Sequence, residues 1–536
     1  MVLCNTSVTP HSKLVSPLAQ VIMPGNQRRT EAGEESVTLQ RQLNLFDCFS
    51  MVVGIIIGSG IFISPKGVLQ SSNSVGWFLV IWVFSGIFSC FGALSYVELA
   101  TSIPLSGGDY TYLRLSFGGL FSFLRIWTII AAVRTGPLTL LSITAGTYLA
   151  GKSAVCSPIA VRLFAACVLC AVTFLNCWSV SLSKKVQNIC TVAKMLGLLV
   201  IIVAGLAQLP KGTTSSFQHP FQRFPGSPGP VDWKNFPSAF FSGVYAFSGW
   251  QNLPQVTEEI VQPGKTMPAA ICLAMGFVTV FYMLTNLAYL AVLTPAEMLA
   301  SDAVAMTFGE AVLGSYWWLM PVAVTLSCFG SINGGLFCTA RSFFAASREG
   351  QLPHILGMVH VHRKTPLAAA ALSLPVCLMM LMIDDIYSLI NYLSFSRWIF
   401  IGMTCAAVPY FRFKYPHIDR PFKVPLIIPI LFALCAFFVV LSSALSDTPA
   451  FLGGLTITII GVPIYFLGIK WKRKPRCFDI IMCRTTRFLQ TVFLIVDTQT
   501  SSSSTHGRGL SRGSREPLLL EDQDQDDYHH SDSLLA

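Results

Sequence analysis

Apolar runs of about 20 residues recur along most of the chain, and a run of that length is what one α-helix needs to cross a bilayer. Hydrophobic residues make up 53% of the 536 residues, and charged residues only 12%. We therefore predict an all-α polytopic membrane protein. Hydropathy predicts about twelve transmembrane helices, near residues 45–66, 77–100, 118–149, 159–180, 187–209, 237–262, 268–293, 315–344, 366–383, 385–411, 424–446 and 450–470.

The loops between these runs predict the orientation. Basic residues concentrate in alternate loops and in the run "KWKRKPR" at 470–476, and loops of this kind face the cytoplasm. Residues 1–43 are polar and lack the apolar core and cleavage site of a signal peptide. We expect both termini in the cytoplasm. The net charge of +10 then follows from the cytoplasmic loops and indicates no nucleic-acid partner.

Two predicted spans are interrupted by residues that disfavour a helix. The first span sets Gly58, Ser59 and Gly60 side by side, and the sixth carries Ser248-Gly249. Unwound backbone inside hydrocarbon is tolerated only where it faces protein, water or a ligand. Small residues also permit close helix packing, so the first stretch alone leaves both interpretations open. Matching interruptions in spans one and six favour two five-helix halves, the pattern of a transporter built from inverted repeats.

Charged residues inside the spans are candidates for function. Lys194 lies near the middle of the fifth span, where a lysine is costly, although its side chain could also reach an interface. For Arg134 in the third span we expect a structural pairing. Three carboxylates at the ends of spans are expected to hold loops rather than bind substrate: Glu98, Glu258 and Glu259.

The pattern of polar residues excludes several classes of protein. We find no Ser-His-Asp pattern, no zinc-ligand spacing and no phosphate-binding loop, so we expect no enzyme activity, no cofactor and no metal. His354, His360 and His362 fall in one predicted cytoplasmic loop and are expected to be solvated. An ion channel is the alternative outside the transporter class, and it would need a ring of carboxylates or carbonyls along a pore.

One cysteine differs from the other fifteen in its predicted place. Of the sixteen cysteines, only Cys156 is predicted to lie in an outer loop, in an oxidising environment. An odd exposed cysteine suggests a disulfide to another chain.

Several stretches resemble one known family. They read "IIIGSGIFISPKGVL", "GALSYVELATSIPLSGGDYTYL", "WQNLPQVTEEI", "SCFGSINGGLFCTARSFFAASREGQLP", "INYLSFSRWIF" and "RPFKVPLIIPI". These stretches are similar to the light subunits of heteromeric amino-acid transporters, in the amino-acid/polyamine/organocation superfamily. The resemblance runs from residue 44 to residue 475 and is strongest to the L-type and asc-type neutral exchangers, with the aromatic-preferring member also similar.

The resemblance implies a 5+5 inverted repeat with broken helices 1 and 6, and sodium-independent exchange of amino acids by alternating access. Main chain at the breaks would bind the carboxylate and ammonium of the substrate, and aromatic side chains would gate and line the pocket. Lys194 would supply a fixed charge in place of a coupling ion. The substrate-binding residues implied in this way are Ile56, Ser59, Gly60, Tyr245, Ser248, Phe395 and Trp398.

The resemblance also implies the substrate, the partner and the location. Because Ser248 stands where relatives that accept cations can place an aspartate, neutral L-amino acids are expected, large or aromatic ones first. Small neutral substrates or a broader range are the alternatives. A single-span glycoprotein heavy subunit would be linked through Cys156 at the plasma membrane. The expected domains are an N-terminal tail at 1–43, a ten-helix transport core at 44–412, two more spans at 413–475 and a largely disordered cytoplasmic tail at 476–536.

Overall fold

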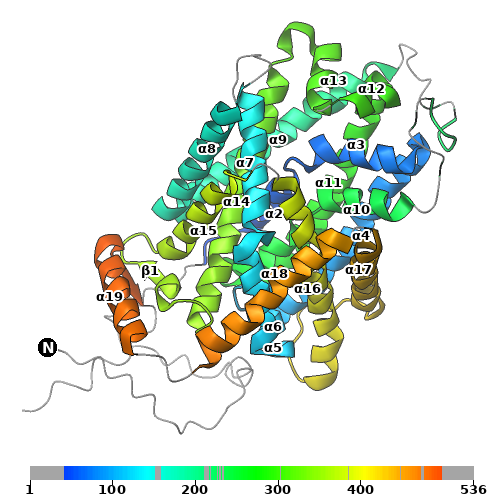
Figure 1. Cartoon of the computed structure of the whole chain (residues 1–536). Helices are drawn as coiled ribbons and strands as arrows, with labels where there is room; N and C mark the ends of the chain where they lie inside the picture. The colour runs from blue at the N-terminus through cyan, green and yellow to red at the C-terminus, as the bar shows by residue number, and fades with distance from the viewer. Residues whose placement is uncertain are drawn as a thin grey trace, which may run out of the picture. The chain divides into compact units, whose positions relative to one another are not determined.

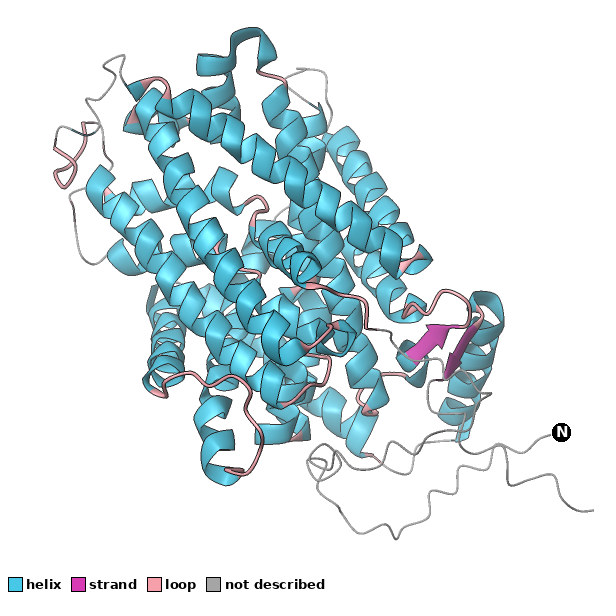
Figure 2. Ribbon diagram, turned by 180° about the vertical axis from the view of Figure 1, so that it is seen from behind, coloured by secondary structure: helices cyan, strands magenta, loops and turns pink. Residues whose placement is uncertain are grey.

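Helices make up nearly all of the described part of the chain, and the two short strands drawn in Figure 2 pair with each other. The computed structural model describes residues 41–150, 158–209, 217, 219–225, 227, 231, 235–301, 303–383, 386–446, 448–471 and 476–497. Side chains of residues 386–395 and of a few other helical positions lie outside this description. The predicted all-α fold is confirmed.

The elements follow one another in this order along the chain. The first half contains α2 (Leu45–Ile56), α3 (Gly60–Ser72), α4 (Val75–Ser102), α5 (Asp109–Phe117), α6 (Gly119–Thr128), η1 (Ile129–Val133), α7 (Thr135–Ala150), α8 (Pro158–Trp178) and α9 (Val180–Leu206). The middle contains α10 (Phe236–Ala246), η5 (Trp250–Glu259), α11 (Pro263–Val292), α12 (Pro295–Ala300), α13 (Val304–Leu313), η6 (Gly314–Tyr316), α14 (Leu319–Arg348), η7 (His354–Gly357) and β1 (Met358–His360). The last part contains α15 (Leu367–Met380), α16 (Ile386–Lys414), α17 (Ile427–Ser446), α18 (Thr448–Tyr465), η8 (Phe466–Lys470), α19 (Arg476–Phe493) and β2 (Ile495–Asp497).

The long helices agree with the predicted spans. Eight helical stretches among the described residues are long and apolar enough to cross a membrane. They coincide with eight of the predicted spans, namely the first five, the seventh, the eighth and the last. The other four predicted spans coincide with the α10–η5 segment, α15, α16 and α17. Helix α2 packs against α9, α11 and α14, in the interior of the bundle (Figure 1).

Both predicted interruptions are present. In the first span the helix stops at Ile56 and starts again at Gly60, so residues 57–59 are unwound. In the sixth span α10 ends at Ala246, Gly249 adopts a φ of +140°, and η5 continues as a 3₁₀-helix. A φ of that sign is readily adopted only by glycine, which explains why this residue type stands at the break.

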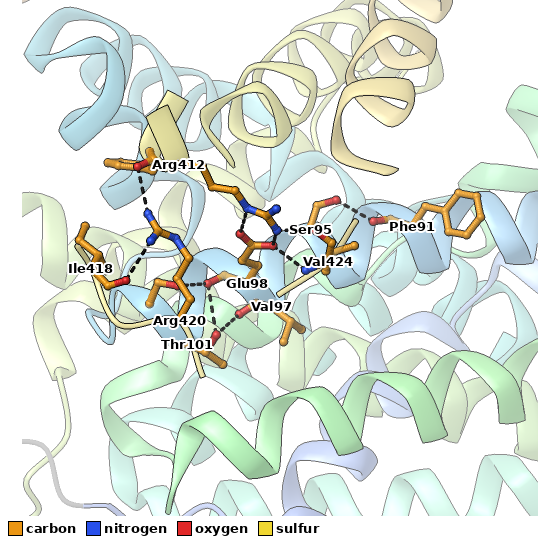
Figure 3. A network of polar contacts seen from close by, with 11 residues as sticks. Phe91, Ser95, Val97, Glu98, Thr101, Arg412, Ile418, Arg420 and Val424 are labelled. Atoms are coloured by element: carbon orange, nitrogen blue, oxygen red, sulfur yellow. Dashed lines mark hydrogen bonds and ion pairs between the residues drawn. The ribbon is translucent and has the colours of Figure 1, made fainter. Parts of the chain in front are cut away.

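A buried carboxylate fastens α4 to the last spans. Glu98 on α4 accepts two hydrogen bonds from Arg412, at 2.7 Å and 2.6 Å, and a third at 2.8 Å from the backbone N–H of Val424 (Figure 3). Nearby, Arg420 donates to the carbonyl oxygens of Phe411, Tyr415, Pro416 and Ile418. The end of α16 and the segment before α17 are therefore held against α4, as expected for Glu98.

The two other predicted carboxylates hold η5 against its neighbours. Glu259 pairs with Arg341 on α14 at 2.7 Å, and both side chains are almost fully buried. The adjacent Glu258 faces the other way, pairs with Arg348 at 3.1 Å and accepts from the backbone N–H of Ser106 at 3.0 Å. These contacts match the expectation that both carboxylates hold loops.

The start of the predicted C-terminal tail contains a helix and a strand. Helix α19 packs beside β2, and β2 pairs antiparallel with β1, with Val359 opposite Val496. The composition of the tail did not reveal this pairing because it joins segments far apart in sequence. The expectation of a solvated His360 is wrong for the same reason, since this residue belongs to β1 and is only 8% exposed.

Candidate functional site

The two helix breaks face each other across backbone contacts. A Cβ atom added at Gly60 would lie 2.9 Å from the Cα of Ala246, and one added at Gly249 would lie 3.1 Å from the backbone N of Ile56. The 2.9 Å approach at Gly60 leaves no room for a side chain. At Gly249 an added Cβ would also lie 3.0 Å from side-chain atoms of Ile55 and Ile56, and the φ of +140° is what requires a glycine there. Beside this seam lies a cavity lined by both breaks, by α7 and η1, and by α14 and α16.

The helix ends at the breaks offer donors and acceptors of opposite sign. The N-terminus of α3 begins at the cavity-lining Gly60 and has no side-chain cap, so its first N–H groups are available to an anion. The carbonyls of Ile56 and Ala246 end α2 and α10. The hydroxyl of Tyr282 lies 3.1 Å from the first and 3.3 Å from the second. A helix end that suits an anion thus lies close to carbonyl oxygens that suit a cation.

The side chain of Lys194 contacts the first break and is not among the described residues that line the cavity. This side chain is 1% exposed. Its ammonium donates to the carbonyls of Gly54 at 2.7 Å, Ile57 at 2.6 Å and Ser327 at 2.9 Å, and the Ser331 hydroxyl oxygen lies 3.2 Å away. The lysine therefore places a positive charge at the C-terminal end of α2, where the helix dipole favours one. The alternative that its ammonium reaches an interface is excluded by this burial.

Three arginines line the cavity, and one of them is neutralised. Arg125 donates through Nε to Asp109 at 2.7 Å, and its Nη2 lies 2.5 Å from the same carboxylate, while its Nη1 is buried without a partner among the described residues. Arg134 donates to the side-chain oxygen of Asn252. The guanidinium of Arg397 makes no hydrogen bond or ion pair to any described residue.

The charge of the cavity is therefore positive. Among the described residues that line it, none is an aspartate or a glutamate. Asp109 balances Arg125 from outside the lining, which leaves Arg134 and Arg397 unbalanced. Arg134 directly follows η1, a short π-helix, and π-helical turns often aim side chains at functional sites.

Apart from Lys194, which lies behind the first break, the predicted site residues divide into three groups. Five line the cavity: Ile56, Ser59, Gly60, Tyr245 and Ser248. Trp398 is not among the described lining residues and packs instead near Phe88 and Phe241, with ring centroids 6.5 Å from each. The side chain of Phe395 and the whole of Cys156 lie outside the described residues.

Comparison with known proteins identifies the family. A family model described as "Amino acid permease" matches residues 43–466. The chain belongs to the amino acid permease family. It is 44% identical to the human cystine/glutamate transporter over 477 residues, covering 88% of this chain and 94% of the relative. It is 41% identical to the mouse large neutral amino acids transporter small subunit 2, covering 90% and 91%, and 38% identical to the mouse asc-type amino acid transporter 1, covering 90% and 92%.

These matches test the resemblance found in the sequence. The family and all three relatives are transporters by name, so the predicted assignment to transporters rather than enzymes is confirmed. The predicted similarity to the L-type and asc-type branch is also confirmed, because the large neutral and asc-type relatives align over nine-tenths of the chain.

Sequence reasoning missed the arginine cluster. Arg397 stands in "INYLSFSRWIF", where the resemblance implied a pocket role only for the aromatic Phe395 and Trp398, and for Arg134 a structural pairing was expected. It does pair with Asn252, yet it also lines the cavity. The signal that could have found both is their charge, because an arginine within a span is a functional candidate by default.

Proposed function

We propose that the protein exchanges amino acids across the plasma membrane without sodium, and that its preferred substrates carry a carboxylate in the side chain. The observation that carries the proposal is the pair of unbalanced arginines, Arg134 and Arg397, in a cavity whose described lining has no acidic residue. The cavity lies within residues 44–412, which we propose as the transport core. The proposal keeps the other predicted domains, namely the two tails at 1–43 and 476–536 and the last two spans at 413–475.

The head group of the substrate is held by the broken helices. Its carboxylate accepts hydrogen bonds from the N-terminus of α3 at Ser59 and Gly60. Its ammonium lies at the carbonyl ends of α2 and α10, near Ile56 and Tyr245. This arrangement recognises any L-amino acid and leaves the side chain to decide the preference.

Charge favours an acidic side chain. A substrate such as glutamate brings a second carboxylate, and a guanidinium binds a carboxylate through two parallel hydrogen bonds. Arg397 has these donors free of described partners, and Arg134 adds a second positive charge. One relative carries glutamate and cystine in its name, which supports this choice.

The proposed sodium independence rests on the buried ammonium of Lys194. The ammonium already provides a cation for the carbonyls of Gly54 and Ile57 at the first break. A sodium ion bound at these oxygens would lie against a fixed positive charge, which strongly disfavours it.

Neutral amino acids are the second candidate, as the sequence predicted. Ser248 donates to the Val244 carbonyl and adds no charge to the cavity, so nothing there attracts a cationic side chain. Two relatives are named for large neutral and asc-type transport. In this case Arg134 and Arg397 would serve the structure of the bundle rather than the substrate.

The partner and the orientation are part of the proposal as well. We place both termini in the cytoplasm on the distribution of basic residues, and we assign a single-span glycoprotein heavy subunit to Cys156. The name of one relative calls it a small subunit, which supports an assembly of two kinds of chain.

The decisive experiment is uptake of labelled amino acids by cells that express the chain with candidate heavy subunits. We expect glutamate and cystine to be taken up faster than leucine, phenylalanine and serine, in choline buffer as in sodium buffer. Unlabelled substrate on the opposite side should accelerate the flux. Faster uptake of leucine or phenylalanine than of glutamate would instead support the neutral candidate, and steep sodium dependence would refute the role of Lys194.

A further inference from the structure

Helix α19 begins close to the membrane surface. The last span ends in η8 at Lys470, and the next residue, Trp471, is 48% exposed. Tryptophan and lysine at the end of a span mark the interface between lipid and water. Helix α19 starts at Arg476, so the chain between them extends no more than roughly 20 Å.

One face of α19 packs on the protein. Gln490 donates to the sulfur of Met358 at 3.4 Å, and half-buried Met482, Leu489 and Phe493 lie on the same side of the helix. The helix contacts η7 and is followed by β2, which pairs with β1. The helix is therefore fixed to the loop between α14 and α15 through this inner face.

The opposite face of α19 exposes large apolar side chains. Ile480 is 53% exposed, Phe488 67% and Val492 54%. Spacings of eight and four residues place the three on one side of a helix. Exposure of an apolar stripe of this kind to water is unfavourable. Such a stripe on a surface helix therefore usually marks a site of contact with another protein or with a membrane.

Positive charge surrounds this stripe. Arg484 and Arg487 are exposed on the same side of α19. Between Lys470 and Phe493 the sequence holds seven basic residues and one acidic residue, Asp479. A cluster of basic residues directly after a span, continued on an amphipathic helix, suits the headgroups of anionic phospholipids.

We propose that α19 lies on the membrane surface beside the end of α18 and binds anionic phospholipid. Arg484 and Arg487 contact the headgroups, and Ile480, Phe488 and Val492 enter the boundary between headgroups and acyl chains. A bilayer suits this face because apolar and basic side chains share it and because the span that precedes it ends nearby. The inference is independent of the substrate.

The test uses the full chain in lipid nanodiscs. An environment-sensitive fluorescent residue replaces Phe488, and some lipids carry a quencher on the acyl chain near the headgroup. We expect phosphatidylserine in phosphatidylcholine discs to raise quenching at least about twofold, and added salt to reverse the increase. The double variant R484Q/R487Q should lose the increase. The control K414Q/K423Q removes two exposed charges from the same side of the membrane and should keep it.

Three outcomes would overturn the inference. The first is no lipid quenching at position 488 in either kind of disc. The second is quenching that is already present in discs of pure phosphatidylcholine and that changes neither when phosphatidylserine is added nor in the R484Q/R487Q variant. The third is a probe shielded from an aqueous quencher until residues 499–536 are removed, which would assign the face to the acidic tail of the chain, "EDQDQDD" at 521–527. Retained amino-acid uptake and a single size-exclusion peak verify that each variant is folded.

Discussion

Arg397 is the residue on which the proposed side-chain preference depends most. We expect Arg397→Gln to lower uptake of glutamate per surface protein by tenfold or more relative to leucine. Loss of one partner from a desolvated charge pair costs about 2–5 kcal/mol, and about 1.4 kcal/mol corresponds to tenfold. Arg397→Lys keeps the charge but loses the planar guanidinium. Its ratio of glutamate to leucine uptake should therefore lie between the ratios of the wild type and of Arg397→Gln. An unchanged ratio of glutamate to leucine in the Gln variant would refute the pairing.

Lys194 permits a test of the first break. We expect Lys194→Ala to reduce transport more than surface abundance, because it removes a buried cation that four oxygens share. Uptake per surface protein, measured in sodium and in choline, checks this. The control Lys185→Ala removes an exposed lysine from the same helix and should leave both quantities unchanged.

At the scale of elements, the seam between the broken helices predicts a steric effect. Gly60→Ala places a methyl group 2.9 Å from the Cα of Ala246, and this contact is relieved only if two backbones separate. We expect transport to fall at least about tenfold. Gly276→Ala is the control, because no atom lies within 4 Å of the added Cβ on α11. Equal uptake by the two variants would show that the breaks do not need to touch.

The two adjacent carboxylates of η5 should differ in their effect on stability. Glu259→Gln leaves Arg341 buried without a counter-ion, a loss of about 3–5 kcal/mol, whereas an exposed pair contributes about 1 kcal/mol or less. Glu258→Gln affects such an exposed pair, with Arg348. Thermal unfolding of both variants in the same detergent should show a clearly larger drop in Tm for Glu259→Gln. A drop of the same size in both would contradict the difference in burial.

At the scale of the whole molecule, the proposed disulfide to a heavy subunit involves Cys156, which lies outside the described part of the chain. We expect a band of higher mass on a non-reducing gel when a heavy subunit is present, and its loss after reduction. Cys156→Ser should abolish the band, while Cys167→Ser, which changes an exposed cysteine on α8, should not. A monomer that reaches the surface alone would argue against the partner.

The sequence predicted the spans and both breaks because these depend on local chemistry. An apolar run of sufficient length must be a span, and Gly58-Ser59-Gly60 weakens a helix wherever it stands. The surroundings of a side chain on a helix were harder to foresee. The resemblance implied that Trp398 lines the pocket, yet the rotation of α16 places Arg397 on the cavity and Trp398 among aromatic rings. That rotation is set by contacts with neighbouring helices, which a single sequence does not reveal.

The meeting of Gly60 with Ala246 and of Gly249 with Ile56 has a mechanical consequence. At Gly60 the main chain lies against the main chain of Ala246, so no rotamer change can absorb a displacement there. At Gly249 the neighbours are the side chains of Ile55 and Ile56 and the backbone N of Ile56. A tilt of α2 and α3 must therefore push α10 and η5 in the same step, and the reverse also holds. The two broken helices are therefore coupled closely at the proposed substrate site, and in the proposed exchange cycle a movement of one of them displaces the other.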